Sequence, residues 1–165
     1  MNTDASIVVR ELDYNDAQDA KYLVQLLNDY ATDPMGGGEE LSDYTKNNLA
    51  ETLSKSPNVF SVIAFVDKQP AGLINCVEGF STFKCQPLVN LHDITVSKPY
   101  RGLGISTKMM AFVEQLAKTR NACKLTLEVL EGNAVAKAAY QNFGFSGYEL
   151  DPQMGKATFW EKPLK

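Results

Sequence analysis

Several features that mark specialised protein classes are scarce or absent in this chain of 165 residues. Its three cysteines, Cys76, Cys85 and Cys123, are too few and too scattered for a disulfide framework or a zinc site, and we expect no metal. No apolar run approaches the roughly 20 residues of a membrane span. The net charge of −4 is not that of a general nucleic-acid surface, which is normally basic. These absences favour an ordinary globular protein without nucleic-acid or membrane partners.

The first ten residues, MNTDASIVVR, lack the basic segment and apolar core of a secretory signal. Together with cysteines that suit small buried hydrophobes, this predicts a cytoplasmic protein. The length is enough for one domain with a real core and too short for two, so we expect a single domain over residues 1–165.

Residues 88–107, LVNLHDITVSKPYRGLGIST, carry the pattern around which the rest is organised. The β-branched run at 91–96 predicts a buried strand, and Pro99 ends it. Residues 101–107 then open a helix, whose first turn offers unpaired N–H donors, with Gly102 and Gly104 allowing close backbone approach. Arg101 adds a planar charged fork suited to phosphate. We name residues 101–107 the phosphate cradle. The helix has its apolar positions at three- and four-residue steps: Ile105, Met109, Phe112, Val113 and Leu116.

The rest of the chain predicts a mixed sheet covered by helices, because a β–α–β crossover at the cradle makes two strands parallel while hairpins make others antiparallel. A helix capped by Asp13 follows the first strand, and Ser42 caps the next helix. The first of these helices has an apolar stripe of Tyr22, Leu23, Leu26, Leu27 and Tyr30. The glycine-rich loop at 32–40 between them is either a linker or a lid over an acceptor site. The strands are expected at residues 6–12, 59–66, 71–80, 91–96, 124–130, 145–150 and 157–162, and the last helix at 134–142, stopped by Gly144.

The segment from Arg101 to Ser106 resembles the R/Q-x-x-G-x-G/A signature of the GCN5-related N-acetyltransferases (GNAT), with Ser106 where that family usually has Gly or Ala. A second block of that family is similar to Asn133, Ala136, Ala139, Tyr140, Gly144 and Phe145. The resemblance implies the α/β GNAT fold, with a mixed, mostly antiparallel sheet of about six to seven strands and four helices.

The resemblance also implies acetyl-CoA as cofactor. In the family the cradle amides hold the pyrophosphate, and here these belong to Leu103, Gly104, Ile105, Ser106 and Thr107, beside Arg101 and Gly102. The central strand, through Ile94, Thr95 and Val96, is expected to pair with the pantetheine arm, and Asn133 with Ala136 to contact the cofactor.

Amine acetylation by direct attack on a thioester needs a base for the ammonium and an acid for the departing thiolate. Tyr140 matches the family's usual acid, although a core tyrosine is the alternative. The base is His92, Glu78 or a water chain. His92 occupies the place of a glutamate in the polyamine acetyltransferase branch, but a neutral histidine bonded within the sheet is equally compatible. Strand alternation places His92 and Asp93 on opposite faces.

The acceptor is expected to be a primary amine of a small molecule, polyamine-like or amino-acid-like, because acidic and aromatic residues gather around the glycine-rich loop. A solvated acidic loop is the alternative. The residues expected to line this pocket are Tyr30, Asp33, Glu39, Tyr44, Phe80, Phe83 and His92.

Three other functions fit parts of the pattern. A non-catalytic acetyl-CoA-binding regulatory domain would use the cradle alone, and a protein N-terminal or lysine acetyltransferase would differ only in its acceptor. A dinucleotide-binding protein would use Gly102-x-Gly104 after a strand, but Thr107 stands where the third glycine belongs. The resemblance to the GNAT family also implies a possible homodimer, formed through the last strands near Phe159 and Trp160.

Overall fold

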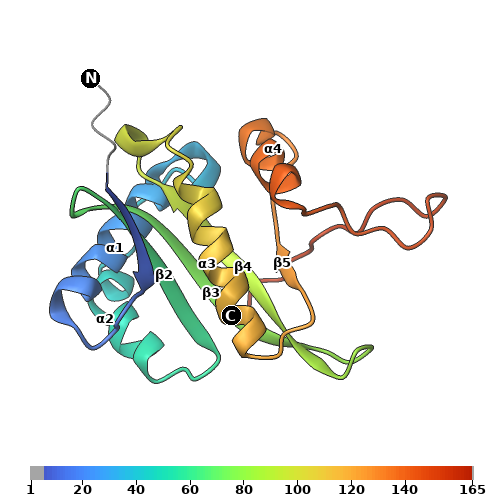
Figure 1. Cartoon of the computed structure of the whole chain (residues 1–165), viewed down its shortest axis with the longest axis horizontal. Helices are drawn as coiled ribbons and strands as arrows, with labels where there is room; N and C mark the ends of the chain where they lie inside the picture. Colours follow the sequence, from blue (N-terminus) through green and yellow to red (C-terminus); the bar gives the residue numbers. More distant parts are fainter. Residues whose placement is uncertain (1–5, 165) are drawn as a thin grey trace. The chain divides into compact units, whose positions relative to one another are not determined.

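The computed structural model describes residues 6–164, which form two compact units, residues 6–127 and residues 128–164 (Figure 1). The first unit contains a five-stranded sheet and three α-helices. The second contains one α-helix and the segment that follows it. Within residues 6–164, no helix combines the length and the apolar character needed to cross a membrane.

The sheet is mixed and mostly antiparallel, as the sequence predicts. Its strands lie in chain order, and each pairs with the next in antiparallel fashion except the last two, which are parallel. Two long neighbours, β3 and β4, form its centre, and the short β5 lies at one edge. The strands are β1 (Ile7–Glu11), β2 (Val59–Val66), β3 (Gln69–Ser81), β4 (Gln86–Val96) and β5 (Leu125–Leu127).

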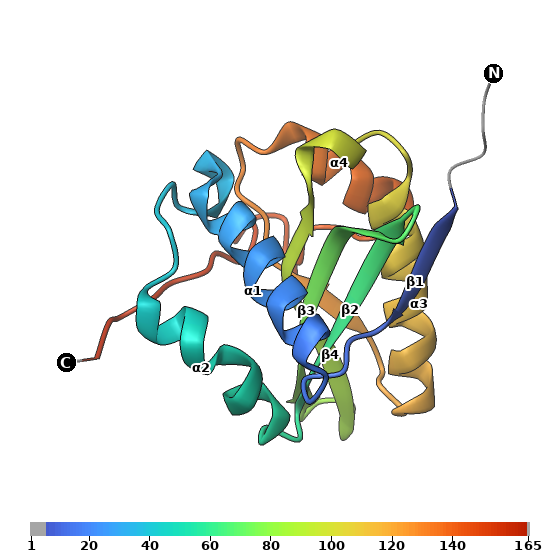
Figure 2. The ribbon, with the colours of Figure 1, turned by 90° about the vertical axis from the view of Figure 1, so that its left-hand side faces the viewer.

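Helices α1 (Ala17–Thr32) and α2 (Asp43–Ser54) cover one face of the sheet, and α3 (Ile105–Thr119) covers the other (Figures 1 and 2). On the first face, the predicted apolar stripe of α1 packs on paired residues of β2 and β3: Leu23 and Leu26 lie fully buried with Ile63 and Leu73. On the second face, Met109 of α3 lies against the backbone of β3 at Gly72, where an added Cβ would come within 2.8 Å of the Met109 Cε.

The start of α1 corrects one prediction. Asp16, and not Asp13, is the N-cap, because its carboxylate accepts hydrogen bonds from the backbone N–H groups of Gln18 and Asp19. Asp13 instead accepts from the N–H of Asn15 at 2.9 Å, which makes a turn before the helix begins. The predicted Ser42 cap of α2 is confirmed by its bond to the N–H of Thr45.

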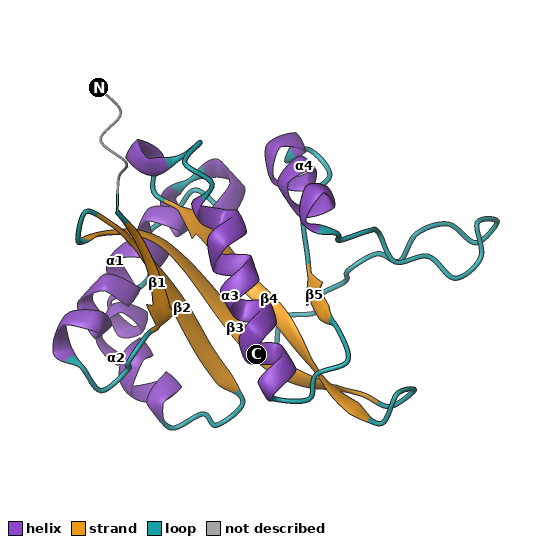
Figure 3. Ribbon diagram, in the orientation of Figure 1, coloured by secondary structure: helices purple, strands orange, loops and turns teal. Residues whose placement is uncertain are grey.

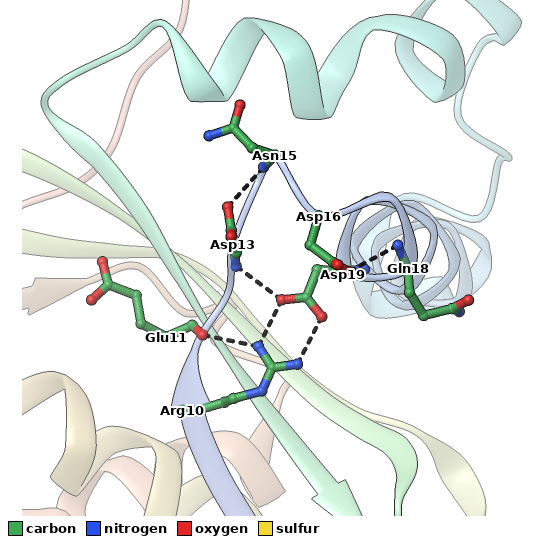
Figure 4. Close-up of polar contacts among 7 residues, drawn as sticks. All are labelled: Arg10, Glu11, Asp13, Asn15, Asp16, Gln18 and Asp19. Atoms are coloured by element: carbon green, nitrogen blue, oxygen red, sulfur yellow. Dashed lines mark hydrogen bonds and ion pairs between the residues drawn. The ribbon is translucent and has the colours of Figure 1, made fainter.

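A two-pronged ion pair joins β1 to the first turn of α1 (Figure 4). Arg10 donates to Asp19 through Nη1 at 2.6 Å and through Nη2 at 2.7 Å, and the N–H of Asp13 adds a third bond at 2.9 Å. The side chain of Asp19 is only 5% exposed. The hydrogen bonds from Arg10 lower the pKa of this carboxyl group more than burial raises it, so it stays ionised.

The β4–α3–β5 crossover has the predicted parallel sense, but β5 is shorter than the predicted strand at 124–130. It pairs only with Val89, Asn90 and Leu91 of β4. The next residue, His92, is an extra residue in the ladder, since Asn75 pairs with Asp93 and Cys76 with Leu91. Pairing with β3 resumes at Asp93, and β5 ends opposite Leu91, one residue before the bulge.

The second unit begins with α4 (Ala134–Phe143), which Asn133 caps through its side-chain oxygen and Gly144 ends with a φ of +113°. The two strands predicted at 145–150 and 157–162 are not formed: these segments are loop except for one antiparallel bridge between Glu149 and Lys156 (Figure 3). Residues 6–164 therefore contain five strands, not the six to seven expected. Two short strands joined to each other without a third lack the ladder partners that make strands stable.

Candidate active site

The strand, turn and helix start of the phosphate cradle are present as the sequence predicts. β4 ends at Val96, a 3-10 turn follows over Lys98–Tyr100, and α3 begins at Ile105. Gly102 and Gly104 have φ values of +84° and +73°, in the left-handed region that glycine adopts without strain. A Cβ added at either glycine would project into space with no atom within 4 Å. The cradle is therefore open beside both glycines.

The first turn of α3 suits an anion. Gly104 is the N-cap and no side chain caps the helix, and the first helical bond runs from the N–H of Lys108 to the carbonyl of Gly104. The N–H groups of Ile105, Ser106 and Thr107 precede that bond, have no acceptor within their own helix and lie at its positive end. These residues fit the pyrophosphate of coenzyme A. Ser106 contributes its backbone N–H to this turn, as any residue at that position would.

Arg101 contacts both the end of β4 and the loop after α1. Its Nε donates to the carbonyl of Val96 at 3.0 Å, and its Nη2 lies 3.3 Å from a carboxylate oxygen of Asp33. The side chain is 54% exposed, against 16% for Asp33. The N–H of Met35, and then Arg101, lower the pKa of Asp33. Arg101 thus links the cradle to the loop after α1 and still presents a cation to solvent.

The glycine-rich loop is folded against the end of α1. The N–H groups of Gly38 and Glu39 donate to the carbonyl of Ala31, and Pro34–Gly36 forms a 3-10 turn. Gly36 lies so close to α1 that an added Cβ would stand 1.9 Å from the carbonyl oxygen of Tyr30. This contact explains the need for glycine there and holds Asp33 in place.

The bulge in β4 brings His92 and Asp93 together, which corrects the expectation that they lie on opposite faces. The Nδ1 of His92 lies 3.3 Å from the Oδ1 of Asp93. The imidazole is 65% exposed and the carboxylate 21% exposed, so His92 is not the buried histidine of the alternative interpretation. Regular alternation fails here because the extra residue changes the direction of the side chains on either side of it.

Tyr30 and Asp33, two of the residues predicted to line the acceptor pocket, lie near each other and near Asp93. The Tyr30 side chain is half-buried, and its pKa is raised by burial and then by the nearby negative charges of Asp93 and Asp33. Glu39 follows on the same loop and is exposed. Tyr30, Asp33, Asp93 and the exposed His92 thus form one acidic and aromatic group, which we name the acceptor cluster.

Other predicted residues lie elsewhere. Phe80 and Phe83 are exposed at the tip of the β3–β4 hairpin, and five residues of strand, roughly 17 Å, separate Phe80 from Asn75 beside the acceptor cluster. Tyr44 is 77% exposed on α2. Glu78 lies 3.8 Å from Arg120, the residue that ends α3 at the opposite end from the cradle. The structure therefore corrects the placement of Phe80 and Phe83, which lie away from the acceptor cluster because they stand at the tip of the β3–β4 hairpin.

In the second unit, the side-chain oxygen of Asn133 accepts from the N–H of Ala136 at 3.1 Å. Tyr140 lies in the last turn of α4, and its ring meets Phe145 edge-on at 6.2 Å between centroids. The roles of these residues toward the cofactor remain predictions.

The sequence interpretation missed three polar residues on the α1 side of the sheet. Ser61 and Asn75 interrupt apolar runs on β2 and β3, and Tyr14 precedes α1. Hydrogen bonds connect all three to Asp93. A polar residue within the apolar run of each of two pairing strands was the available sign.

A hollow of about 270 Å³ lies beside the segment that leads into the cradle. None of the four residues of the acceptor cluster lines this hollow, so the hollow is not the predicted acceptor pocket. Its lining residues are Tyr22, Gln25, Asp29, Gln69, Pro70, Ser97, Pro99 and Tyr100.

Comparison with known proteins decides the family. The model of the acetyltransferase (GNAT) family matches residues 21–145, which is most of the chain. The chain belongs to the GNAT family. It is an acetyl-CoA-dependent N-acetyltransferase, and this sets aside the dinucleotide-binding alternative.

The GNAT relatives include proteins named for small-molecule acceptors. The thialysine N-epsilon-acetyltransferase of Caenorhabditis elegans is 26% identical over 131 residues, 74% of this chain and 81% of the relative. The streptothricin acetyltransferase of Streptomyces lavendulae is 36% identical over 70 residues, 42% of this chain and 37% of the relative. The crystal structure of the aminoglycoside acetyltransferase meta-AAC0020, from an uncultured soil metagenomic sample, superposes with a TM-score of 0.78 at 14% identity, covering 96% of this chain and 97% of that one. That likeness shows the same fold.

Proposed function

We propose that this GNAT enzyme acetylates a primary amine of a small, cationic molecule, polyamine-like or amino-acid-like. The acceptor cluster is the observation that carries the proposal, because it places the carboxylates of Asp33 and Asp93 beside Tyr30 and an exposed imidazole. Such a group attracts a cation and offers a base to it. The relatives named for thialysine, streptothricin and aminoglycosides support a small acceptor.

The cofactor side of the proposal rests on the cradle. The N–H groups of residues 103–107 would hold the pyrophosphate, with Arg101 beside them, and the edge of β4 at Ile94, Thr95 and Val96 would pair with the pantetheine arm. Acetyl-CoA supplies an activated acetyl group as a thioester. Pairing along β4 is available beyond Leu91, because β5 has already ended there.

We assign the base to His92 and the acid to Tyr140. His92 lies within the acceptor cluster and is exposed, whereas Glu78 lies beside Arg120 at the far end of α3. The imidazole takes a proton from the ammonium, the amine nitrogen bonds to the acetyl carbon, and the carbon–sulfur bond breaks. The Tyr140 hydroxyl protonates the thiolate, since a phenol and a thiolate are of similar basicity.

Release of free thiol from acetyl-CoA over a panel of amines tests the function. The panel contains a polyamine, lysine, thialysine, an aminoglycoside and a peptide with a free N-terminus. We expect turnover with small cationic amines. Turnover with the peptide alone would establish a protein acetyltransferase instead, and acetyl-CoA binding without turnover of any amine would establish the regulatory domain.

Two variants test the assigned residues. Tyr140→Phe is expected to lower kcat at least tenfold with little change in the KM for acetyl-CoA, and an unchanged kcat removes Tyr140 as the acid. His92→Gln is expected to abolish the acidic limb of kcat/KM against pH. Glu78→Gln is the matched control, because it exchanges a carboxyl group outside the acceptor cluster.

We further propose that the two units make one acetyltransferase domain, because the family match runs from residue 21 in the first to residue 145 in the second. The second unit exposes Phe159 and Trp160, at 73% and 86%, and we propose that this segment pairs with a second copy of the chain. Sedimentation of the full chain and of Trp160→Glu tests it: we expect a dimer that the variant weakens, and a monomeric wild-type chain contradicts the proposal.

A further inference from the structure

A chain of four polar side chains crosses the sheet on the side of α1. Tyr14 precedes α1, and Ser61, Asn75 and Asp93 stand on β2, β3 and β4 as directly paired neighbours. The Tyr14 hydroxyl lies 2.7 Å from the Ser61 Oγ, the Ser61 Oγ 2.6 Å from the Asn75 Oδ1, and the Asn75 Nδ2 3.0 Å from the Asp93 Oδ2. We name these four residues the polar chain.

The charge on Asp93 sets the direction of every bond in the polar chain. A carboxylate only accepts, so the Asn75 amide must turn its NH₂ group toward Asp93 and its carbonyl toward Ser61. The single hydroxyl proton of Ser61 is then donated to that carbonyl. Tyr14 must therefore donate its own proton to the Ser61 oxygen.

His92 lies beside the second oxygen of the Asp93 carboxylate. The Oδ2 of Asp93 is occupied by Asn75, and the Oδ1 faces the Nδ1 of His92 at 3.3 Å. An acceptor at that position favours the imidazole tautomer with its proton on Nδ1. The lone pair then lies on Nε2, on a side chain that is 65% exposed.

We propose that Asp93 is a positioning residue, which the polar chain holds in place and which fixes His92 in the tautomer that leaves Nε2 free to act as base. This inference rests on the proposed function, in which His92 takes the proton of the amine. Asn75, Ser61 and Tyr14 act one step further away, by fixing the carboxylate and not by touching the substrate.

The polar chain makes an unusual prediction for Asp93→Asn. The other end of the polar chain keeps its direction in this variant, because Tyr14 gives its proton to Ser61 and Ser61 gives its own to the Asn75 carbonyl. The NH₂ group of Asn75 therefore still points toward residue 93, so the new amide must turn its oxygen to Asn75 and its own NH₂ group to His92. A donor at that position requires the lone pair on Nδ1, and the proton moves to Nε2. We expect kcat/KM to fall about 10- to 100-fold, because the base then lacks its lone pair on the exposed nitrogen.

The reciprocal double variant Asn75→Asp with Asp93→Asn restores the arrangement. The new amide at position 93 then donates to the new carboxylate at position 75, so the amide oxygen faces His92 again and the imidazole proton returns to Nδ1. The double variant has the same composition and net charge as the wild type. We expect it to recover most of the kcat/KM that the single variant loses, which a merely structural role of Asp93 does not predict.

Nitrogen-15 NMR of the full chain labelled at histidine reads the tautomer directly, because His92 is the chain's single histidine. Spectra are recorded well above the pH at which an imidazole is protonated. Asp67→Asn is the control: it removes the same charge from the β2–β3 turn, where φ is +47° and asparagine is well tolerated. It should leave both tautomer and kcat/KM at wild-type values.

The spectra separate this inference from the proposed function, because they need no acetyl transfer. A wild-type imidazole with its proton on Nε2 overturns the inference whatever the variants do, and so does an unchanged tautomer in Asp93→Asn. A flipped tautomer with wild-type kcat/KM also overturns it, because His92 is then not the base. Absence of turnover with every amine defeats the proposed function alone.

Discussion

Two arginine–aspartate pairs in this molecule use the same chemical groups in different ways. Arg10 grips Asp19 with two bonds of 2.6 and 2.7 Å, and the carboxylate is almost fully buried. Arg101 reaches Asp33 with one nitrogen at 3.3 Å, and more than half of the arginine side chain is exposed. The first pair joins β1 to α1, and the second joins the cradle to the loop beside the acceptor cluster.

The difference teaches what each pair can do. A desolvated, bidentate pair is costly to break, because removing one partner leaves the other charge buried. A single contact near the surface is screened by water and contributes little to folding, so the arginine can exchange its partner for a ligand. We therefore interpret Arg10–Asp19 as a structural joint and Arg101–Asp33 as an adjustable contact at the active site.

The largest effect should come from breaking the structural joint. Arg10→Ala leaves the Asp19 carboxylate with the Asp13 N–H and without its cation, and it also removes the guanidinium stacked 5.0 Å from the centre of the Phe65 ring. We expect the free energy of unfolding to fall by about 2 kcal/mol, less than for a fully buried pair because Arg10 is partly exposed. Urea unfolding measures it.

Lys55→Ala is the control for that experiment, because it removes an exposed pair with Glu51 on α2. We expect no measurable change in its urea midpoint. If Arg10→Ala and Lys55→Ala lose equal amounts of unfolding free energy, burial does not distinguish the Arg10–Asp19 pair from a surface ion pair.

The pH dependence of stability sharpens the same comparison. The pKa of Asp19 is lowered in the folded state, so its contribution is present above the unfolded value of about 3.9 and is lost as the pH falls through the lower folded value. Asp19→Asn should therefore be less stable than the wild type at pH 7, with a difference that narrows below about pH 4. Urea midpoints of both proteins between pH 7 and pH 3 measure this, and a difference independent of pH would contradict it.

Much of the fold follows from local patterns in the sequence. The apolar period of α1 and α3, the Ser42 cap and the glycine turn before Ile105 are all short-range features, and all are found as predicted. Short-range patterns also gave the wrong cap at Asp13, because Asp13 and Asp16 offer the same side chain and only the turn between them decides.

The features that local patterns could not supply depend on distant partners. The bulge at His92 arises from a mismatch in residue count between β3 and β4, and no property of His92 itself reveals it. Arg101 contacts Asp33, which is 68 positions away in the sequence. Phe80 lies away from the acceptor cluster because it stands at the tip of the β3–β4 hairpin. The sequence therefore supplies candidate residue types for the site, while their arrangement depends on partners distant in the chain.

The smallest effect on stability, and the most informative on function, should come from the adjustable contact. Arg101→Ala removes one exposed ion pair and the bond to the Val96 carbonyl, so the urea midpoint should stay close to wild type. We expect the KM for acetyl-CoA to rise about tenfold, because a cation beside the cradle is lost. Arg101→Lys should reverse only part of this rise in KM, since lysine keeps the charge without the planar fork.

Asp33→Asn releases Arg101 while leaving the cradle intact. It should leave the KM for acetyl-CoA unchanged or lower, and it should raise the KM for a cationic amine. An Arg101→Ala variant that unfolds as readily as Arg10→Ala would make both pairs structural joints, and the contrast between them would fail.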